Sequence, residues 1–317
     1  MMLKAELRGM ATAGVLGLAG LLLLVSVPPD LPGVDLLQSL RFYLAALGIP
    51  LVLVLFLTRA PWRGLLALVM VVASAGQGLL PVMAGYQARA QVNGETLASV
   101  KLLSFNVLAT NEQGRAAADF IIATAPDIAV IMETPGVMPY LDDIAHVLPY
   151  RLGCAVPATC DLTVFSRTPF DTEQMRNLPP YGHERLAIAS TTIRGTPVTV
   201  VGMHLSKPYF DGAAYIELES AYWALSKLPG RMIIAGDFNA AAWSDAVVSF
   251  SDALQLAPPP VHPATWPVEA GDLGVPIDNM FTRGAALIDT IEAPANSYGS
   301  NHRALLAEIS LRAARQP

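Results

Sequence analysis

Residues 232–240 read MIIAGDFNA, and this stretch says more about the fold than any other in the chain. Four apolar residues precede a glycine, and Asp237 and Asn239 follow, so the pattern predicts a short buried strand that ends in polar side chains. Side chains two positions apart on an extended segment point to the same side. We therefore expect Asp237 and Asn239 to lie together where the chain leaves a buried sheet.

Apolar runs that end in polar residues recur on both sides of this stretch. The pattern predicts strands at residues 100–107, 127–132, 162–166, 186–193, 198–203, 232–235 and 304–311. The polar residues at or beside the ends of these strands, together with the Asp of PIDNMF, are Asn106, Glu133, His204, Asp237, Asn239, Asp278, Asn301 and His302. Functional groups often occupy such rims, where the chain leaves a buried sheet.

Helical spacing separates several of these strands. Residues 115–123 and 213–228 carry apolar side chains three to four positions apart, which is typical of helices that cover a sheet. Alternation of strands with such segments predicts a domain of the α/β (α+β) class.

The first 88 residues have a different composition. The chain has 317 residues, of which 53% are hydrophobic and 15% charged, and the apolar excess is concentrated at this end. The uncharged stretches at residues 9–29, 42–58 and 64–88 are each near the length of a membrane span, so we expect three transmembrane helices. A cleaved secretory signal is the alternative for the first stretch.

Charges around these stretches predict their orientation. The N-terminus and the second connection carry the cations Lys4, Arg8, Arg59 and Arg63, whereas the first connection carries Asp30 and Asp35. By the positive-inside rule the cation-bearing loops face the cytoplasm. We therefore expect an inner or plasma membrane protein with its C-terminal domain in the periplasm or outside the cell.

The expected organisation is a membrane domain at residues 1–88, a linker at 89–99 and a second domain at 100–317. From residue 95 onward the chain carries 14 Lys and Arg against 23 Asp and Glu, a net charge of -9. Such an acidic domain is not a globally basic nucleic-acid binder. An anionic substrate would need local positive charge or a metal ion.

Both cysteines, Cys154 and Cys160, lie in the second domain at the two ends of CAVPATC. In an oxidising compartment this spacing favours a small-loop disulfide. Two unrelated buried thiols are the alternative. A metal site is disfavoured because no histidine or second cysteine pair accompanies them.

Taken in order, the motifs FNV, MET, GMHL, GDFNA, ID and S-x-H before a strand resemble the endonuclease/exonuclease/phosphatase superfamily of metal-dependent phosphoesterases. The resemblance covers residues 100–311, and GDFNA is its most specific element. It implies a four-layer α/β sandwich, in which two mixed sheets pack face to face with helices outside.

The resemblance also implies a metal site for Mg²⁺, or Mn²⁺ as a substitute. Glu133 is the expected carboxylate ligand, with Asn106 beside it, because Mg²⁺ prefers hard oxygen ligands. Where the family usually has an Asp before the terminal histidine, this chain has Asn301. The amide removes one negative charge, so we expect a weaker single-metal site; compensation by another carboxylate or loss of catalysis are the alternatives.

Catalytic roles follow from the same resemblance. Asp237 would orient or deprotonate the attacking water, and Asn239 would donate a hydrogen bond to the phosphate. His302, held in the right tautomer by Asp278, would stabilise the pentavalent phosphorus, and His204 would assist the leaving group or bind phosphate. Outside this set, we interpret His146, His183 and His262 as surface or loop histidines, and Glu184 and Arg185 as a rim ion pair or groups reaching the rim of the site.

The sequence thus predicts a membrane-anchored metal-dependent phosphoesterase that hydrolyses phosphodiesters or phosphomonoesters. Its substrate could be a nucleic acid, a phospholipid head group or a small phosphoester; the acidic domain disfavours a nonspecific nuclease. The alternative from another class is a noncatalytic binding module that keeps the fold, with Asn301 as its support. No protein partner is inferable.

Overall fold

The computed structural model describes residues 2–28, 33–208 and 212–314 and divides into two compact units. One unit is built mainly from the N-terminal helices, and the other contains both sheets and the remaining helices. Asp30 and the end of the first apolar stretch, at residue 29, lie outside the described residues.

The N-terminal helices are α1 (Met2–Ser26), α2 (Val34–Ser39), α3 (Arg41–Leu57) and α4 (Pro61–Ala90). Among the described residues, only α1 and α4 are helices long and apolar enough to cross a membrane. The expectation of three such helices is wrong for the second stretch, because α3 has 17 residues and spans about 26 Å at 1.5 Å per residue, short of a core of about 30 Å. A signal sequence can be as long and apolar as α1, so length and composition alone are weak evidence that these helices associate with a membrane.

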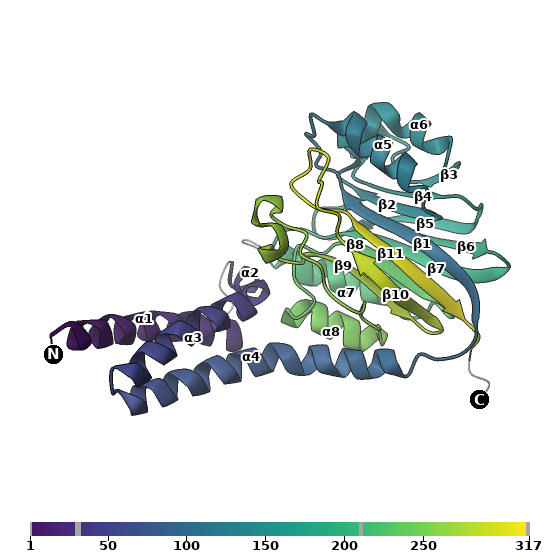
Figure 1. The fold of residues 1–317 in the computed structure, drawn as a ribbon. Coiled ribbons are helices and arrows are strands. Elements are labelled where there is room, and N and C mark those ends of the chain that lie inside the picture. Colours follow the sequence, from purple (N-terminus) through teal and green to yellow (C-terminus); the bar gives the residue numbers. More distant parts are fainter. Residues whose placement is uncertain (1, 29–32, 209–211, 315–317) are drawn as a thin grey trace. The chain divides into compact units, whose positions relative to one another are not determined.

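The second unit contains two mixed β-sheets (Figure 1). The first has the order β10-β11-β1-β2-β4-β3 and the second the order β5-β6-β7-β8-β9. Each sheet has one parallel pair, β1 with β2 and β7 with β8, and the other pairs are antiparallel. The strands are β1 (Thr96–Asn106), β2 (Ile128–Met132), β3 (Tyr150–Leu152), β4 (Leu162–Ser166), β5 (Phe170–Leu178), β6 (His183–Ile193), β7 (Thr196–His204), β8 (Met232–Asp237), β9 (Asp278–Arg283), β10 (Ala286–Glu292) and β11 (Leu305–Arg312).

Alternation along the strands explains why the sheets form layers. Ile233 and Ala235 of β8 face the core between the sheets, whereas Met232 and Ile234 face the helices on the other side. The outer helices are α5 (Gly114–Thr124) and α6 (Leu141–Ala145) over the first sheet, and α7 (Ala213–Leu225) and α8 (Asp245–Leu254) over the second (Figure 1). The short 3-10 helices are η1 (Thr134–Tyr140), η2 (Pro157–Thr159) and η3 (Val268–Leu273). The architecture matches the expected α/β sandwich.

All seven predicted strands are present, as β1, β2, β4, β6, β7, β8 and β11. The remaining strands, β3, β5, β9 and β10, were not predicted with defined limits. β5 shows why, because most of its side chains are exposed and polar, so it lacks the apolar run by which buried strands are recognised. The chain passes from α4 to β1 within residues 91–95.

Cys154 and Cys160 are paired in the structure, with Cα atoms 4.4 Å apart. Both sulfur-bearing side chains are buried, while the residues between them are exposed. The pair closes the loop between β3 and β4, and Asp161 follows it directly.

Candidate active site

Strand register brings the predicted polar residues to one end of the sandwich. His204 ends β7 opposite Asp237 at the end of β8, and Asp237 lies opposite Asp278 at the start of β9. Asn106 ends β1 in the other sheet, and its Nδ2 donates to Asp237 Oδ2 over 3.0 Å. The carboxyl ends of both parallel pairs therefore meet at the same place.

Gly236 shows why the chain needs glycine in the GDFNA stretch. Its φ is +154°, and a Cβ atom at this position would lie 1.8 Å from the carbonyl oxygen of Met203 on β7. Only a residue without a side chain permits β8 to approach β7 so closely just before the carboxylate of Asp237.

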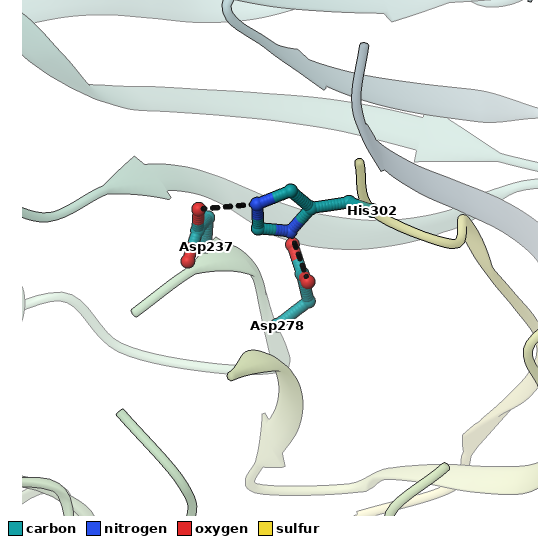
Figure 2. A group of neighbouring side chains, drawn as sticks. All are labelled: Asp237, Asp278 and His302. Carbon is teal, nitrogen blue, oxygen red and sulfur yellow. Dashed lines mark hydrogen bonds and ion pairs between the residues drawn. The ribbon is translucent and has the colours of Figure 1, made fainter. Parts of the chain in front are cut away.

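His302 lies between two carboxylates (Figure 2). Its Nδ1 is 2.8 Å from Asp278 Oδ2, and its Nε2 is 3.8 Å from Asp237 Oδ2. Burial alone would lower the pKa of His302, but the charges of Asp278 and Asp237 and the hydrogen bond that His302 donates to Asp278 outweigh it and raise this pKa to about 9. Burial and the charge of Asp278 raise the pKa of Asp237.

The serine of the S-x-H motif fixes the segment that carries this histidine. Ser300 Oγ donates to the carbonyl oxygen of Asn106 over 2.6 Å and accepts the backbone N–H of His302 over 3.0 Å. The histidine is thereby tied to the end of β1, because one hydroxyl serves as donor to one segment and acceptor from the other.

Asn106 links Glu133 to Asp237, two of the acidic groups of the site. Its Nδ2 donates to Glu133 Oε1 over 3.2 Å as well as to Asp237, while its Oδ1 accepts the backbone N–H of Leu108. The other oxygen of Glu133 accepts the N–H of Ala109 over 2.8 Å. Glu133 has a φ of +51°, a left-handed conformation that is uncommon outside glycine and turns its side chain at the end of β2.

Asn239 also has a left-handed φ, +49°. Its backbone N–H donates to Asp237 Oδ1 over 2.8 Å, and its Nδ2 donates to the carbonyl oxygen of Leu205 over 2.8 Å. The amide of Asn239 thus has a second N–H beyond the one given to Leu205.

A second histidine–carboxylate pair involves a residue that the sequence analysis missed. His204 Nδ1 is 2.7 Å from Asp161 Oδ2, and its Nε2 is 4.0 Å from Asp237 Oδ2. Burial would lower the pKa of His204, but Asp161 raises it. Arg185 Nε also donates to Asp161 Oδ2, over 3.1 Å, so Arg185 lies in this network and not in a rim pair with Glu184. The available signal for Asp161 was its place directly before the strand at residues 162–166.

The donor set fits a hard divalent cation. Asn301 Oδ1 is buried and, among the described residues, has no hydrogen-bond partner; the same holds for Asp278 Oδ1. One ligand atom each from Asp237, Asp278 and His302 lie within 4.8 Å of one another. In that group, however, Nδ1 of His302 is already bonded to Asp278, so oxygens are the better candidate ligands. Carboxylate and amide oxygens are what Mg²⁺ and Mn²⁺ prefer.

The two packed sheets and this group of buried carboxylates and histidines form an arrangement suited to hydrolysis. The chain belongs to the endonuclease/exonuclease/phosphatase family, whose model matches residues 103–302. No curated relative matches the chain by sequence.

Solved structures share the fold. D. rerio TDP2 complexed with a single-strand DNA product has a TM-score of 0.57 and 18% identity, covering 67% of this chain and 99% of that one. Sphingomyelinase C from Streptomyces griseocarneus has a TM-score of 0.50 and 19% identity, covering 67% and 99%. A beta toxin mutant from Staphylococcus aureus with bound magnesium ions has a TM-score of 0.50 and 13% identity, covering 66% and 99%.

Proposed function

We propose that this chain is a membrane-anchored, metal-dependent phosphoesterase that hydrolyses phosphodiesters or phosphomonoesters outside the cytoplasm. The observation that carries the proposal is the placement of His302, bonded at Nδ1 to Asp278 with Nε2 directed to Asp237. A buried imidazole between two carboxylates, one of which ends a strand beside Asn239, is suited to phosphate chemistry. Family membership supports the same class of reaction.

Hydrolysis of a phosphate ester requires a water molecule in line with the leaving group and donors for the phosphoryl oxygens. Asp237 is the proposed group that orients or deprotonates this water. His302 and the second side-chain N–H of Asn239, beyond the one donated to Leu205, are the proposed donors to the phosphoryl oxygens. His204, oriented by Asp161 through Nδ1, is the proposed donor to the leaving oxygen.

Glu133, Asn106 and Asn301 would hold the cation. When bound, Mg²⁺ or Mn²⁺ would neutralise the negative charge that develops on the phosphoryl oxygens. In this structure the amide nitrogen of Asn106, not its oxygen, faces Glu133. The buried, unpaired Oδ1 of Asn301 supports a place for it in the ligand set.

The choice among substrates depends on charge. The domain from residue 95 onward has a net charge of -9, which opposes nonspecific binding of a nucleic-acid backbone. The structural neighbours include a DNA-bound protein and a sphingomyelinase, so both ester classes fit the fold. Tethering to a membrane raises the effective concentration of a head group, and we therefore favour a phospholipid or small phosphate ester.

The second candidate function is a noncatalytic binding module. Its support is Asn301, which replaces the carboxylate that the family usually places before the terminal histidine. Such a module would bind phosphate esters without turnover.

Turnover by the full-length chain tests the proposal. The substrates are bis(p-nitrophenyl) phosphate, p-nitrophenyl phosphate, plasmid DNA and sphingomyelin vesicles, each with Mg²⁺, Mn²⁺ or a chelator. We expect metal-dependent hydrolysis that falls by about 10²- to 10⁴-fold in Asp237→Ala and His302→Asn. His146→Asn, which changes an exposed histidine, is the matched control and should keep full activity.

The same experiment separates the two candidate functions. Activity that is equal in wild type and His302→Asn would contradict the site assignment. A folded chain without turnover on any substrate and with any cation would reject the enzyme and leave the binding module. The preferred ester identifies the substrate class.

A further inference from the structure

Glu217 is a buried carboxylate that the proposed mechanism does not use. It lies on α7, on the side that faces the second sheet, with 1% of its surface exposed. Burial of a carboxylate is costly unless its oxygens are paired. The hydrogen-bond partners of Glu217 therefore indicate which part of the structure this buried carboxylate holds in place.

Both oxygens of Glu217 bind the same residue, two positions after His204. The backbone N–H of Ser206 donates to Oε2 over 2.6 Å, and the Ser206 hydroxyl donates to Oε1 over 2.8 Å. A hydroxyl has one proton, so donation to Glu217 leaves only its lone pairs for other contacts. Arg185 uses one of them, because its Nη1 donates to Ser206 Oγ over 3.2 Å.

Arg185 connects this contact to the histidine. Its Nε donates to Asp161 Oδ2 over 3.1 Å, and the same oxygen lies 2.7 Å from His204 Nδ1. The guanidinium is thus fixed at two points, and Asp161 is fixed from two sides. A continuous set of hydrogen bonds runs from α7 through Ser206 and Arg185 to Asp161 and His204.

The segment between His204 and Ser206 is held from the other side as well. Leu205 donates its N–H to the carbonyl oxygen of Asp237 over 2.8 Å and accepts Asn239 Nδ2 over 2.8 Å. Glu217 therefore completes the fixation of a segment that already contacts two proposed catalytic residues. Its replacement would release Ser206 while leaving both Leu205 contacts in place.

We propose that Glu217 is a positioning residue: it orients the Ser206 hydroxyl so that Arg185 and Asp161 hold His204 in place for catalysis. This inference rests on the proposed function, since it concerns the same site. Residues that orient a functional side chain through one intermediate contact commonly change activity by about 10- to 100-fold when altered.

The test uses Glu217→Gln in the full-length chain, because glutamine keeps the shape but cannot accept from both donors of Ser206. With bis(p-nitrophenyl) phosphate and Mg²⁺ we expect kcat to fall about tenfold while KM stays within about threefold. Ser206→Ala should lower kcat by a similar factor. The double variant should lose no more than either single variant, because both changes break the same connection. Glu219→Gln, an exposed residue of the same helix, is the matched control.

A second measurement is independent of turnover. The ring N–H signal of His204 in the ¹⁵N-histidine spectrum, assigned with His204→Asn, should shift in Glu217→Gln and in Ser206→Ala but not in Glu219→Gln. This shift without any turnover in the wild type would refute the proposed function and keep the positioning role. An unchanged His204 signal with unchanged kcat would overturn the inference, as would a melting temperature that falls while both readouts remain constant. Additive losses in the double variant would also overturn it.

Discussion

Asn301 precedes His302, and its Oδ1 is buried without a hydrogen-bond partner among the described residues. An uncharged oxygen in this position contributes less to cation affinity than a carboxylate would. We predict that Asn301→Asp binds Mg²⁺ about tenfold more tightly, measured by isothermal titration calorimetry. In chelator the same variant should melt at a lower temperature than the wild type, because a buried carboxylate oxygen without a bound cation costs more than a buried amide oxygen.

Asn177→Asp, a change on the exposed part of β5, controls for the added charge of Asn301→Asp. It should alter neither Mg²⁺ affinity nor the melting temperature in chelator. Equal Mg²⁺ affinity in Asn301→Asp and the wild type would remove Asn301 from the proposed ligand set.

His262 provides a second prediction at the scale of a residue. It was predicted to be a surface or loop histidine, and in the structure it is half-buried in the loop before β9. Burial lowers the pKa of His262 to about 4, so below about pH 6.5 the unfolded chain binds a proton that the folded chain does not. Stability should consequently fall as the pH falls from about 6.5 to about 4, by at most about 3 kcal/mol from this group.

Urea unfolding at several pH values measures this dependence. In His262→Gln the slope of the unfolding free energy against pH should be smaller over that interval. The exposed His183→Gln should leave the slope unchanged. Identical slopes in His262→Gln and the wild type would show that His262 does not contribute.

At the scale of elements, the contact between β7 and β8 depends on Gly236. A methyl group there would lie 1.8 Å from the backbone oxygen of Met203, and backbone cannot move aside as a flexible side chain could. We predict that Gly236→Ala costs more than about 3 kcal/mol of unfolding free energy in urea, because the strands must separate beside Asp237. Gly195→Ala meets open space and should cost only about 1–2 kcal/mol for its left-handed φ. Similar losses in both variants would contradict the steric explanation.

The loop between β3 and β4 is the second element with a testable role. The pair Cys154 and Cys160 closes it directly before Asp161, whose backbone oxygen also accepts the N–H of Thr134. From the length of the loop, replacing both cysteines by serine should lower the unfolding free energy by about 2 kcal/mol. A reductant should lower the stability of the wild type by a similar amount and leave the double variant unchanged. Free thiols in protein alkylated without reductant would refute the bridge.

At the scale of the whole molecule, α1 and α4 predict membrane association. We predict that the full-length chain stays with the membrane fraction after an alkaline carbonate wash, which releases peripheral proteins but not spanning helices. Protease added outside intact cells or spheroplasts should cut the second unit, as the positive-inside rule requires. Release by the wash would exclude spanning helices, and protection from protease would reverse the orientation.

The positions of the buried strands, and the side chains that lie at their ends, could be predicted from the sequence. Apolar runs such as residues 232–235 identify strands because the period of two and the burial of both faces are local properties. The order of the motifs that contain Glu133, Asp237 and His302 was sufficient to predict the family to which the chain belongs. Strands with exposed polar side chains, such as β5, carry no such signal and were missed.

Which of these residues contact one another depends on the packing of distant elements and could not be predicted from the sequence. Asp161 and His204 are 43 positions apart, and their contact depends on how two sheets pack face to face. Glu217 was read as part of a helix, and its bonds to Ser206 follow from which side of α7 faces the second sheet. Spacing along a chain fixes the direction of a side chain within its element, whereas its partner depends on register and packing between distant elements.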